Sequence, residues 1–134
     1  MVHQPKDSVI LETTDLYDSI VRFNKNNYNK HEGKHPELRQ KQFCPGQIIM
    51  ALKTPSFVIK GRNPDTLCYY FELFRVRDVI KLVKVVVLET NRHSPNDPHC
   101  VIKTAFKTDH VQELKYGYEP MCYNNYKLSR RMYG

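Results

Sequence analysis

The sequence carries one strongly β-forming stretch, Lys81-Leu82-Val83-Lys84-Val85-Val86-Val87-Leu88. Because side chains alternate along a strand, Val85 and Val87 are predicted on one face of a sheet and Val86 on the other. Apolar residues on both faces are typical of a central strand that is covered on both sides. A polar turn with two prolines separates this stretch from a second strand, predicted over residues 100–107. The two strands are therefore predicted to pair as an antiparallel hairpin with a long loop.

Two shorter strands and a helix are predicted just before this hairpin. Pro45 favours a helix start, because proline at the first helical position lacks only a donor that the helix does not need, and Pro55 ends the helix. Strands are predicted over about 56–60 and 67–74. Gly61-Arg62-Asn63-Pro64-Asp65 is a strong turn signal between them.

The N-terminal part of the chain has a weaker pattern. Ser8 is a candidate cap for a helix over roughly residues 8–24, with apolar contacts at Leu16, Ile20 and Phe23. The asparagine-rich residues 24–30 interrupt the pattern and are predicted to form a connector.

Together these elements predict an α+β fold, in which N-terminal helices pack on one face of a small, mostly antiparallel four-stranded sheet. With 134 residues, the chain is most simply a single domain over 1–134. Residues 111–134 are basic and rich in tyrosine, and they are interpreted as a tail.

The charge balance favours acidic partners. The chain has 21 Lys and Arg against 14 Asp and Glu, a formal net charge of +7. Such a surplus points first to nucleic acid and second to an anionic membrane, although an ordinary basic soluble protein has the same composition. No apolar run approaches the roughly 18 residues that cross a bilayer, and charged residues interrupt the first 25 positions. A cytoplasmic protein without a signal peptide is expected, acting on no membrane.

The four cysteines, Cys44, Cys68, Cys100 and Cys122, form no Cys-x-x-Cys pair. Their spacing does not suggest zinc, and reduced thiols are expected. The sequence also lacks glycine-rich phosphate-binding and dinucleotide-binding loops and a Gly-x-Ser-x-Gly elbow. No metal and no small-molecule cofactor are expected.

Histidines within a basic stretch are the leading candidates for chemistry. Cleaving RNA without a metal requires proton transfer, which suits histidine, and charge stabilisation at phosphorus, which suits arginine and lysine. His31, His35 and Arg39 would share one face if their segment were helical, although Pro36 interrupts it. Histidines four apart also bind metals, but this pair lacks the glutamate of a His-Glu-x-x-His site. Surface histidines in a polar loop are the equally weighted alternative.

Further candidates lie on the last predicted strand and after it. Alternation puts Lys103 with Val101 and Ala105 on one face and Thr104 on the other, and His110 follows the strand as a candidate general acid. The alternative is that Lys103 simply reaches into solvent and contacts no phosphate. Of Tyr69 and Tyr70, one is expected in the core and one exposed for stacking on bases. The candidate nucleic-acid contacts are Arg62, Tyr70 and Lys107.

Several of these segments resemble the barnase–EndoU–colicin–RelE-like nuclease superfamily, closest to its small members from phage and polymorphic-toxin loci. The resemblance covers about residues 31–110. The similar segments are His35-Pro36-Glu37-Leu38, Ile48 to Pro55 followed by the Tyr69-Tyr70 strand, Lys84-Val85-Val86-Val87, and Val101-Ile102-Lys103-Thr104-Ala105-Phe106. Ile102-Lys103-Thr104 and Thr108-Asp109-His110 also look like the end of barnase, where a strand leads into the catalytic histidine.

The resemblance implies helices on one side of the sheet and an active site on the other, RNA as substrate, and a cyclic phosphate product. The chain lacks an obvious glutamate base on a central strand, so the base stays open, with His35 or His31 as candidates and His110 as the acid. Arg39 and Lys103 would hold the scissile phosphate, and Thr104 would donate a hydrogen bond. The hypothesis is a metal-independent endoribonuclease of toxin type. Its expected partners are RNA and an immunity or antitoxin protein. The alternatives are a non-catalytic RNA- or DNA-binding module and a phage accessory or structural protein.

Overall fold

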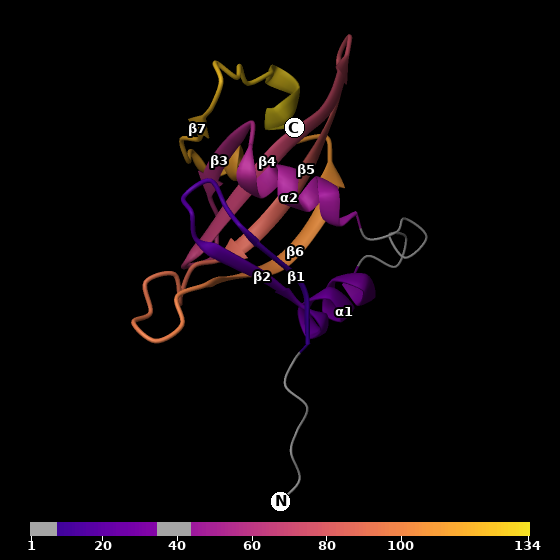
Figure 1. Cartoon of the computed structure of the whole chain (residues 1–134). Helices are drawn as coiled ribbons and strands as arrows, with labels where there is room; N and C mark the ends of the chain where they lie inside the picture. Colours follow the sequence, from indigo (N-terminus) through magenta and orange to yellow (C-terminus); the bar gives the residue numbers. More distant parts are fainter. Residues whose placement is uncertain (1–7, 35–43) are drawn as a thin grey trace, which may run out of the picture.

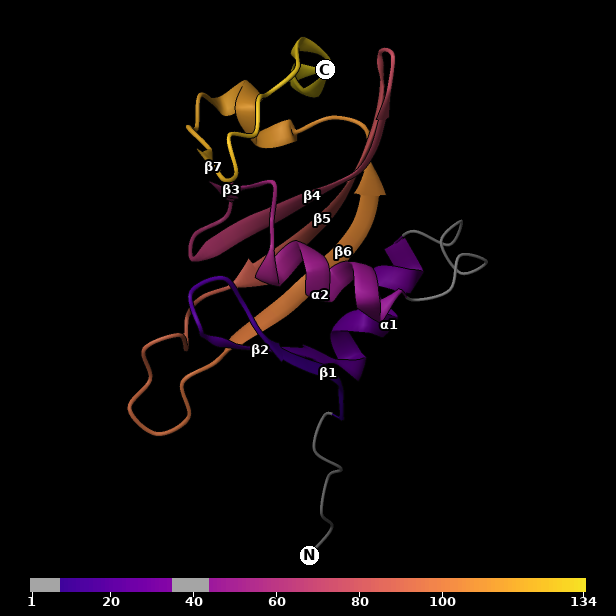
Figure 2. The same cartoon turned by 45° about the horizontal axis from the view of Figure 1, so that its top comes forward.

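A computed structural model describes residues 8–34 and 44–134, with the side chains of residues 30–34 left undescribed (Figures 1 and 2). The fold is α+β, with two short α-helices and a seven-stranded sheet. In chain order the elements are β1 (Val9–Thr14), β2 (Ile20–Asn24), α1 (Lys25–Lys34), α2 (Pro45–Lys53), β3 (Phe57–Lys60), β4 (Thr66–Val76), β5 (Val79–Leu88), β6 (Cys100–Thr108), η2 (Gln112–Tyr116), β7 (Met121–Cys122) and η3 (Arg130–Tyr133).

The sheet is larger than the four strands predicted. Its order is β1-β2-β6-β5-β4-β3-β7, and all neighbours are antiparallel except β2 and β6. The four predicted strands are β3 to β6, which form a continuous antiparallel meander in the middle. The β1–β2 hairpin extends this meander at the β6 edge, and β7 extends it at the β3 edge.

The helix predicted over residues 8–24 is wrong, because this segment forms the β1–β2 hairpin. A turn at Asp15 interrupts the segment: the Asp15 carboxylate accepts bonds from the backbone N–H groups of Tyr17 and Ser19, each at 2.9 Å. The residues on either side are mostly β-branched, which favours strands. The predicted connector is also wrong in part, since α1 begins at Lys25.

The helix that starts at Pro45 and the β5–β6 hairpin are confirmed. α2 buries Ile48, Ala51 and Leu52 against one face of the sheet, which we call the helix face. Val85 and Val87 belong to this core, whereas Val86 packs on the other side, as the alternation predicted. Figures 1 and 2 show α2 lying across the sheet and α1 beside β2 and β6.

The other side, which we call the C-terminal face, carries a second apolar core. Residues 111–134 pack here and contribute the buried Val111, Leu114 and Met132 against Phe57, Ile59 and Leu82 of the strands. The backbone N–H of Val111 donates to the Met132 carbonyl at 2.6 Å, which joins the two ends of this segment. Two layers therefore cover the central strands, one on each face.

Strand β6 does not alternate as the sequence suggested. Its partners on β5 change register between Val86 and Val87: Val86 faces Thr104, while Val87 faces Ile102. Lys103 is thus an extra, bulged residue, and both Ile102 and Ala105 point to the helix face. The predicted grouping of Val101 with Ala105 on one face is wrong, because the bulge reverses the alternation beyond it.

Candidate functional site

The end of β6 borders a pocket that gathers several ionisable side chains. We call it the His110 pocket. It has a volume of about 350 Å³. Its lining residues are Asp78, Val79, Ile80, Lys81, Asp109, His110, Arg131 and Gly134. They come from the β4–β5 turn and the start of β5, from the loop after β6, and from the C-terminal segment, so three distant parts of the chain meet here.

His110 has a partner that fixes its orientation. Its Nδ1 lies 2.9 Å from Oδ1 of Asp109. This hydrogen bond holds the pKa of the Asp109 carboxyl below its usual range. With Nδ1 bound, Nε2 is the ring nitrogen left to exchange a proton with a ligand. The side chains of His110 and Asp109 are 48% and 70% exposed, so a solute can reach them.

Lys81 and Arg131 share this pocket with His110. Lys81 can face the pocket because the sheet leaves one edge of β5 unpaired at this point. The β5–β6 pairing begins at Leu82 and Thr108, so residues 79–81 of β5 pair only with β4. The pocket lies at this uncovered edge of β5, next to η3, which supplies Arg131. The two carboxylates of the lining, Asp78 and Asp109, stand beside Lys81, Arg131 and His110. Such a set can bind an anion and transfer a proton.

Lys103 and Thr104 lie away from this pocket. Thr108 follows Lys103 by five positions along β6, which corresponds to about 16 Å of extended strand. Lys103 is exposed on the bulge, and Thr104 is half-buried. Near them, the Asn27 side chain of α1 donates to the Ile102 carbonyl at 3.2 Å. The structure thus keeps the predicted acid, His110, apart from the predicted phosphate ligand, Lys103.

Three predicted catalytic side chains lie outside the described part of the chain. The backbone of His31 belongs to α1, but its side chain is not described, and His35 and Arg39 fall among residues 35–43. The predicted base therefore stays a prediction.

The predicted nucleic-acid contacts Arg62 and Lys107 are exposed. Arg62 Nη1 donates to the Tyr116 hydroxyl at 2.9 Å, and its guanidinium lies 4.8 Å from the centre of that ring. Lys107 lies on β6 opposite Val83. Neither residue lines the His110 pocket.

Tyr69 and Tyr70 are both fully buried, so the expectation that one of them is exposed is wrong. The Tyr70 hydroxyl donates to Glu113, and Lys84 Nζ lies 2.8 Å from the other oxygen of the same carboxylate. Burial, followed by the Glu113 charge, raises the pKa of Tyr70. This closed network joins the meander to η2, and it explains why a lysine and a glutamate can be buried in an apolar layer.

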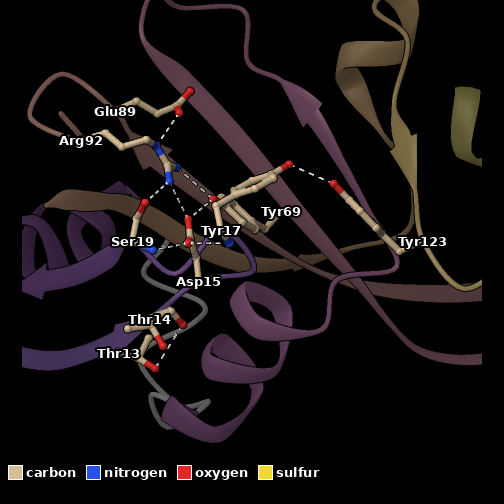
Figure 3. A network of polar contacts seen from close by, with 9 residues as sticks. All are labelled: Thr13, Thr14, Asp15, Tyr17, Ser19, Tyr69, Glu89, Arg92 and Tyr123. Carbon is tan, nitrogen blue, oxygen red and sulfur yellow. Dashed lines mark hydrogen bonds and ion pairs between the residues drawn. The ribbon is translucent and has the colours of Figure 1, made fainter.

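A second buried network lies at the end of the sheet away from the His110 pocket (Figure 3). Asp15 Oδ2 accepts from the Tyr69 hydroxyl at 2.5 Å and from Arg92 Nη1 at 3.0 Å. Arg92 also binds Ser19 and Glu89, and so the β5–β6 loop is attached to the β1–β2 turn. Among the described residues, every buried side-chain polar atom has a hydrogen-bond partner.

The sequence did not reveal Lys81 and Arg131 as site residues. Lys81 had been assigned to the valine-rich strand and Arg131 to a tail, and nothing local distinguishes them from other basic residues. Asp109, next to His110, was the available signal: a carboxylate beside a histidine at a strand end can orient the ring.

Comparison of the chain with models of protein families, with curated proteins and with solved structures gives no match. Over residues 8–34 and 44–134, no helix is long and apolar enough to cross a bilayer. The same residues contain no group of three or more His, Cys, Asp or Glu side chains that could hold a metal ion.

Proposed function

We propose that this protein is a metal-independent endoribonuclease whose chemistry takes place in the His110 pocket. One observation carries the proposal: the pocket combines an oriented histidine with two cations, Lys81 and Arg131, at an accessible edge of the sheet. The net charge of +7 favours a polyanionic substrate. The four-stranded meander with helices on one face agrees with the resemblance to the nuclease superfamily, whereas the other face, where the resemblance implies the active site, is covered by residues 111–134.

The reaction is an internal transfer at phosphorus. The 2′-oxygen loses its proton and forms a bond to phosphorus, while the bond to the 5′-oxygen breaks and that oxygen gains a proton. As the general acid, His110 Nε2 gives a proton to the leaving 5′-oxygen, and Asp109 keeps the ring in the required orientation. The base that takes the proton of the 2′-hydroxyl stays a prediction, with His35 or His31 as candidates. Lys81 and Arg131 stabilise the charge that develops on the phosphate oxygens. The products are a cyclic phosphate and a 5′-hydroxyl, and no cofactor is consumed.

A cytoplasmic RNA is the natural substrate under this proposal. A toxin that cleaves cellular RNA would also require an immunity or antitoxin protein in the cell that makes it. Such a partner would be acidic where it covers Lys81 and Arg131, because charge complementarity governs the encounter.

The alternative is a non-catalytic RNA-binding module, and a specific observation favours it. Lys103 and His110 lie apart on β6 instead of surrounding one phosphate. Under this alternative the same basic residues bind RNA, and no bond is broken.

The deciding experiment is cleavage of a single-stranded RNA by purified protein in the presence of a chelator. We expect cleavage with wild type and a decrease of roughly 10²–10⁴-fold in His110→Ala, the usual share of one positioned acid or base. His93→Ala is the matched control, because His93 is an exposed histidine of the β5–β6 loop outside the pocket. Equal cleavage by both variants would remove His110 from the mechanism. RNA binding by wild type without any cleavage would favour the binding module.

A further inference from the structure

The tip of the β4–β5 hairpin exposes an apolar strip. Phe74, Val76 and Val79 are 45%, 61% and 54% exposed. Val76 pairs with Val79 and Phe74 pairs with Lys81, so all four side chains share one face of the hairpin. Figures 1 and 2 both show this hairpin projecting beyond the end of β6. The strip therefore lies on the helix face of the sheet, beyond the part of that face that α2 covers.

The strip and the His110 pocket are contiguous. Val79 and Lys81 line the pocket, and each stands opposite one residue of the strip on β4. Cross-strand partners have Cβ atoms about 5 Å apart, so the Phe74 ring lies beside Lys81, one of the two cations of the pocket. An apolar platform beside a cationic pocket matches one base and its neighbouring phosphate.

We propose that this strip holds an unpaired base of single-stranded RNA, with Phe74 as the stacking platform, while the adjacent phosphate occupies the His110 pocket. This inference rests on the proposed function and specifies its substrate class. A base can lie flat on an aromatic ring only when it is free of its own helix. Val76 and Val79 offer no hydrogen-bond donor or acceptor side chains, so the strip accepts any base. The substrate is unpaired RNA with little sequence preference at this position.

An RNA occupant fits the strip better than a lipid bilayer does. The charges at the tip are mixed, because Arg77 and Asp78 share the hairpin turn and Asp109 stands beside the pocket. The tip therefore lacks the uniform rim of cations that would favour an anionic bilayer. A single phosphate can instead be held between Lys81, Arg131 and His110.

The test uses Phe74→Trp in a His110→Ala background, so that binding is measured without cleavage. The chain has no tryptophan, and the new indole would therefore be the sole one to report on the strip. We expect its emission to be quenched by a single-stranded oligoribonucleotide and unaffected by the corresponding RNA duplex. In the same background, Phe74→Ala should weaken single-strand binding by about 5- to 150-fold, the range for loss of one stacked base. Met121→Ala is the control, since Met121 is a 53% exposed apolar residue on β7.

The outcomes separate this inference from the proposed function. Quenching by single strands, with wild type failing to cleave RNA, would keep the strip as an RNA site and overturn the catalytic proposal. Normal cleavage together with unchanged binding by Phe74→Ala would overturn the strip and keep the catalysis. Equal quenching by duplex and single strand, or an emission change only with vesicles of anionic phospholipid, would also overturn it.

Discussion

Each end of the central sheet carries an aspartate paired with a basic side chain, and the two pairs differ in their surroundings. At one end, Asp15 and Arg92 form an ion pair whose side chains are 0% and 8% exposed. At the other end, Asp109 and His110 form a pair whose side chains are 70% and 48% exposed. The first pair is enclosed by further protein partners, and the second faces an open pocket. Burial, more than residue type, therefore distinguishes the charges that hold this fold from those available to a ligand.

The largest effect is expected at the closed end. Asp15→Ala removes the acceptor of two turn N–H groups and leaves Arg92 buried with one carboxylate fewer. Breaking a buried pair from one side typically lowers the free energy of unfolding by about 3–5 kcal/mol. Urea denaturation measures this loss. A decrease below about 1 kcal/mol would show that the Asp15 network does not hold the two loops together.

The Lys84–Glu113 pair allows a sharper version of the same test. Lys84→Met leaves the Glu113 carboxylate buried with only the Tyr70 hydroxyl, and we expect a loss of about 3 kcal/mol or more. Adding Glu113→Leu to Lys84→Met removes the orphaned charge, and part of the stability should return, while the buried Tyr70 hydroxyl still lacks its acceptor. Thermal unfolding of both variants checks this. A double variant no more stable than the single one would contradict it.

Alkaline pH should destabilise the two buried layers of the fold. Burial raises the pKa of Cys68 to about 12 and that of Cys100 to about 11, and burial together with Glu72 raises the pKa of Tyr126 to about 12. A folded-state pKa above the unfolded value means that the folded state binds more protons. Stability is then fully present below the unfolded values, near 8.5 for cysteine and 10 for tyrosine, and falls as the pH rises toward the folded ones.

Urea denaturation across this alkaline range measures the change. The midpoint should decline steadily from about pH 9 upward. A midpoint that stays constant to pH 11 would show that these groups are not buried as described.

The smallest effect on folding is expected at the open end. Asp109→Ala removes a partner of an exposed histidine, and its free energy of unfolding should stay within about 0.5 kcal/mol of wild type. Its RNA cleavage should still fall, because the His110 ring loses the acceptor at Nδ1. Parallel stability and cleavage assays test both statements. A strong loss of stability would place this pair with the structural ones.

The sequence predicts the meander well because its strands are locally distinctive. Alternation around Val85, Val86 and Val87, the proline-flanked helix at Pro45 and the turn before β6 all act over a few residues. The N-terminal hairpin was missed because its tight turn depends on Asp15 bonding to neighbouring backbone, which hydrophobic periodicity does not detect. The spacing of Leu16, Ile20 and Phe23 also matches one side of a helix by coincidence.

The candidate site was predicted only in part because tertiary contacts create it. His110 could be identified from the strand that precedes it. Lys81 lies 29 positions before His110 and Arg131 lies 21 positions after it, so only the folded chain brings the three residues together. The bulge at Lys103 likewise depends on the register with β5, so alternation along β6 assigned the neighbouring side chains to the wrong faces.

The most direct measurement compares RNA cleavage by two double variants that each remove two positive charges. Lys81→Ala with Arg131→Ala empties the pocket of its cations, and Lys103→Ala with Lys107→Ala removes exposed lysines elsewhere on β6. We expect the RNA cleavage rate of the pocket variant to fall roughly 10²–10³-fold, the scale of lost transition-state charge stabilisation, and the β6 variant to keep most of its activity. The reverse result, with Lys103 and Lys107 required and the pocket cations dispensable, would contradict it.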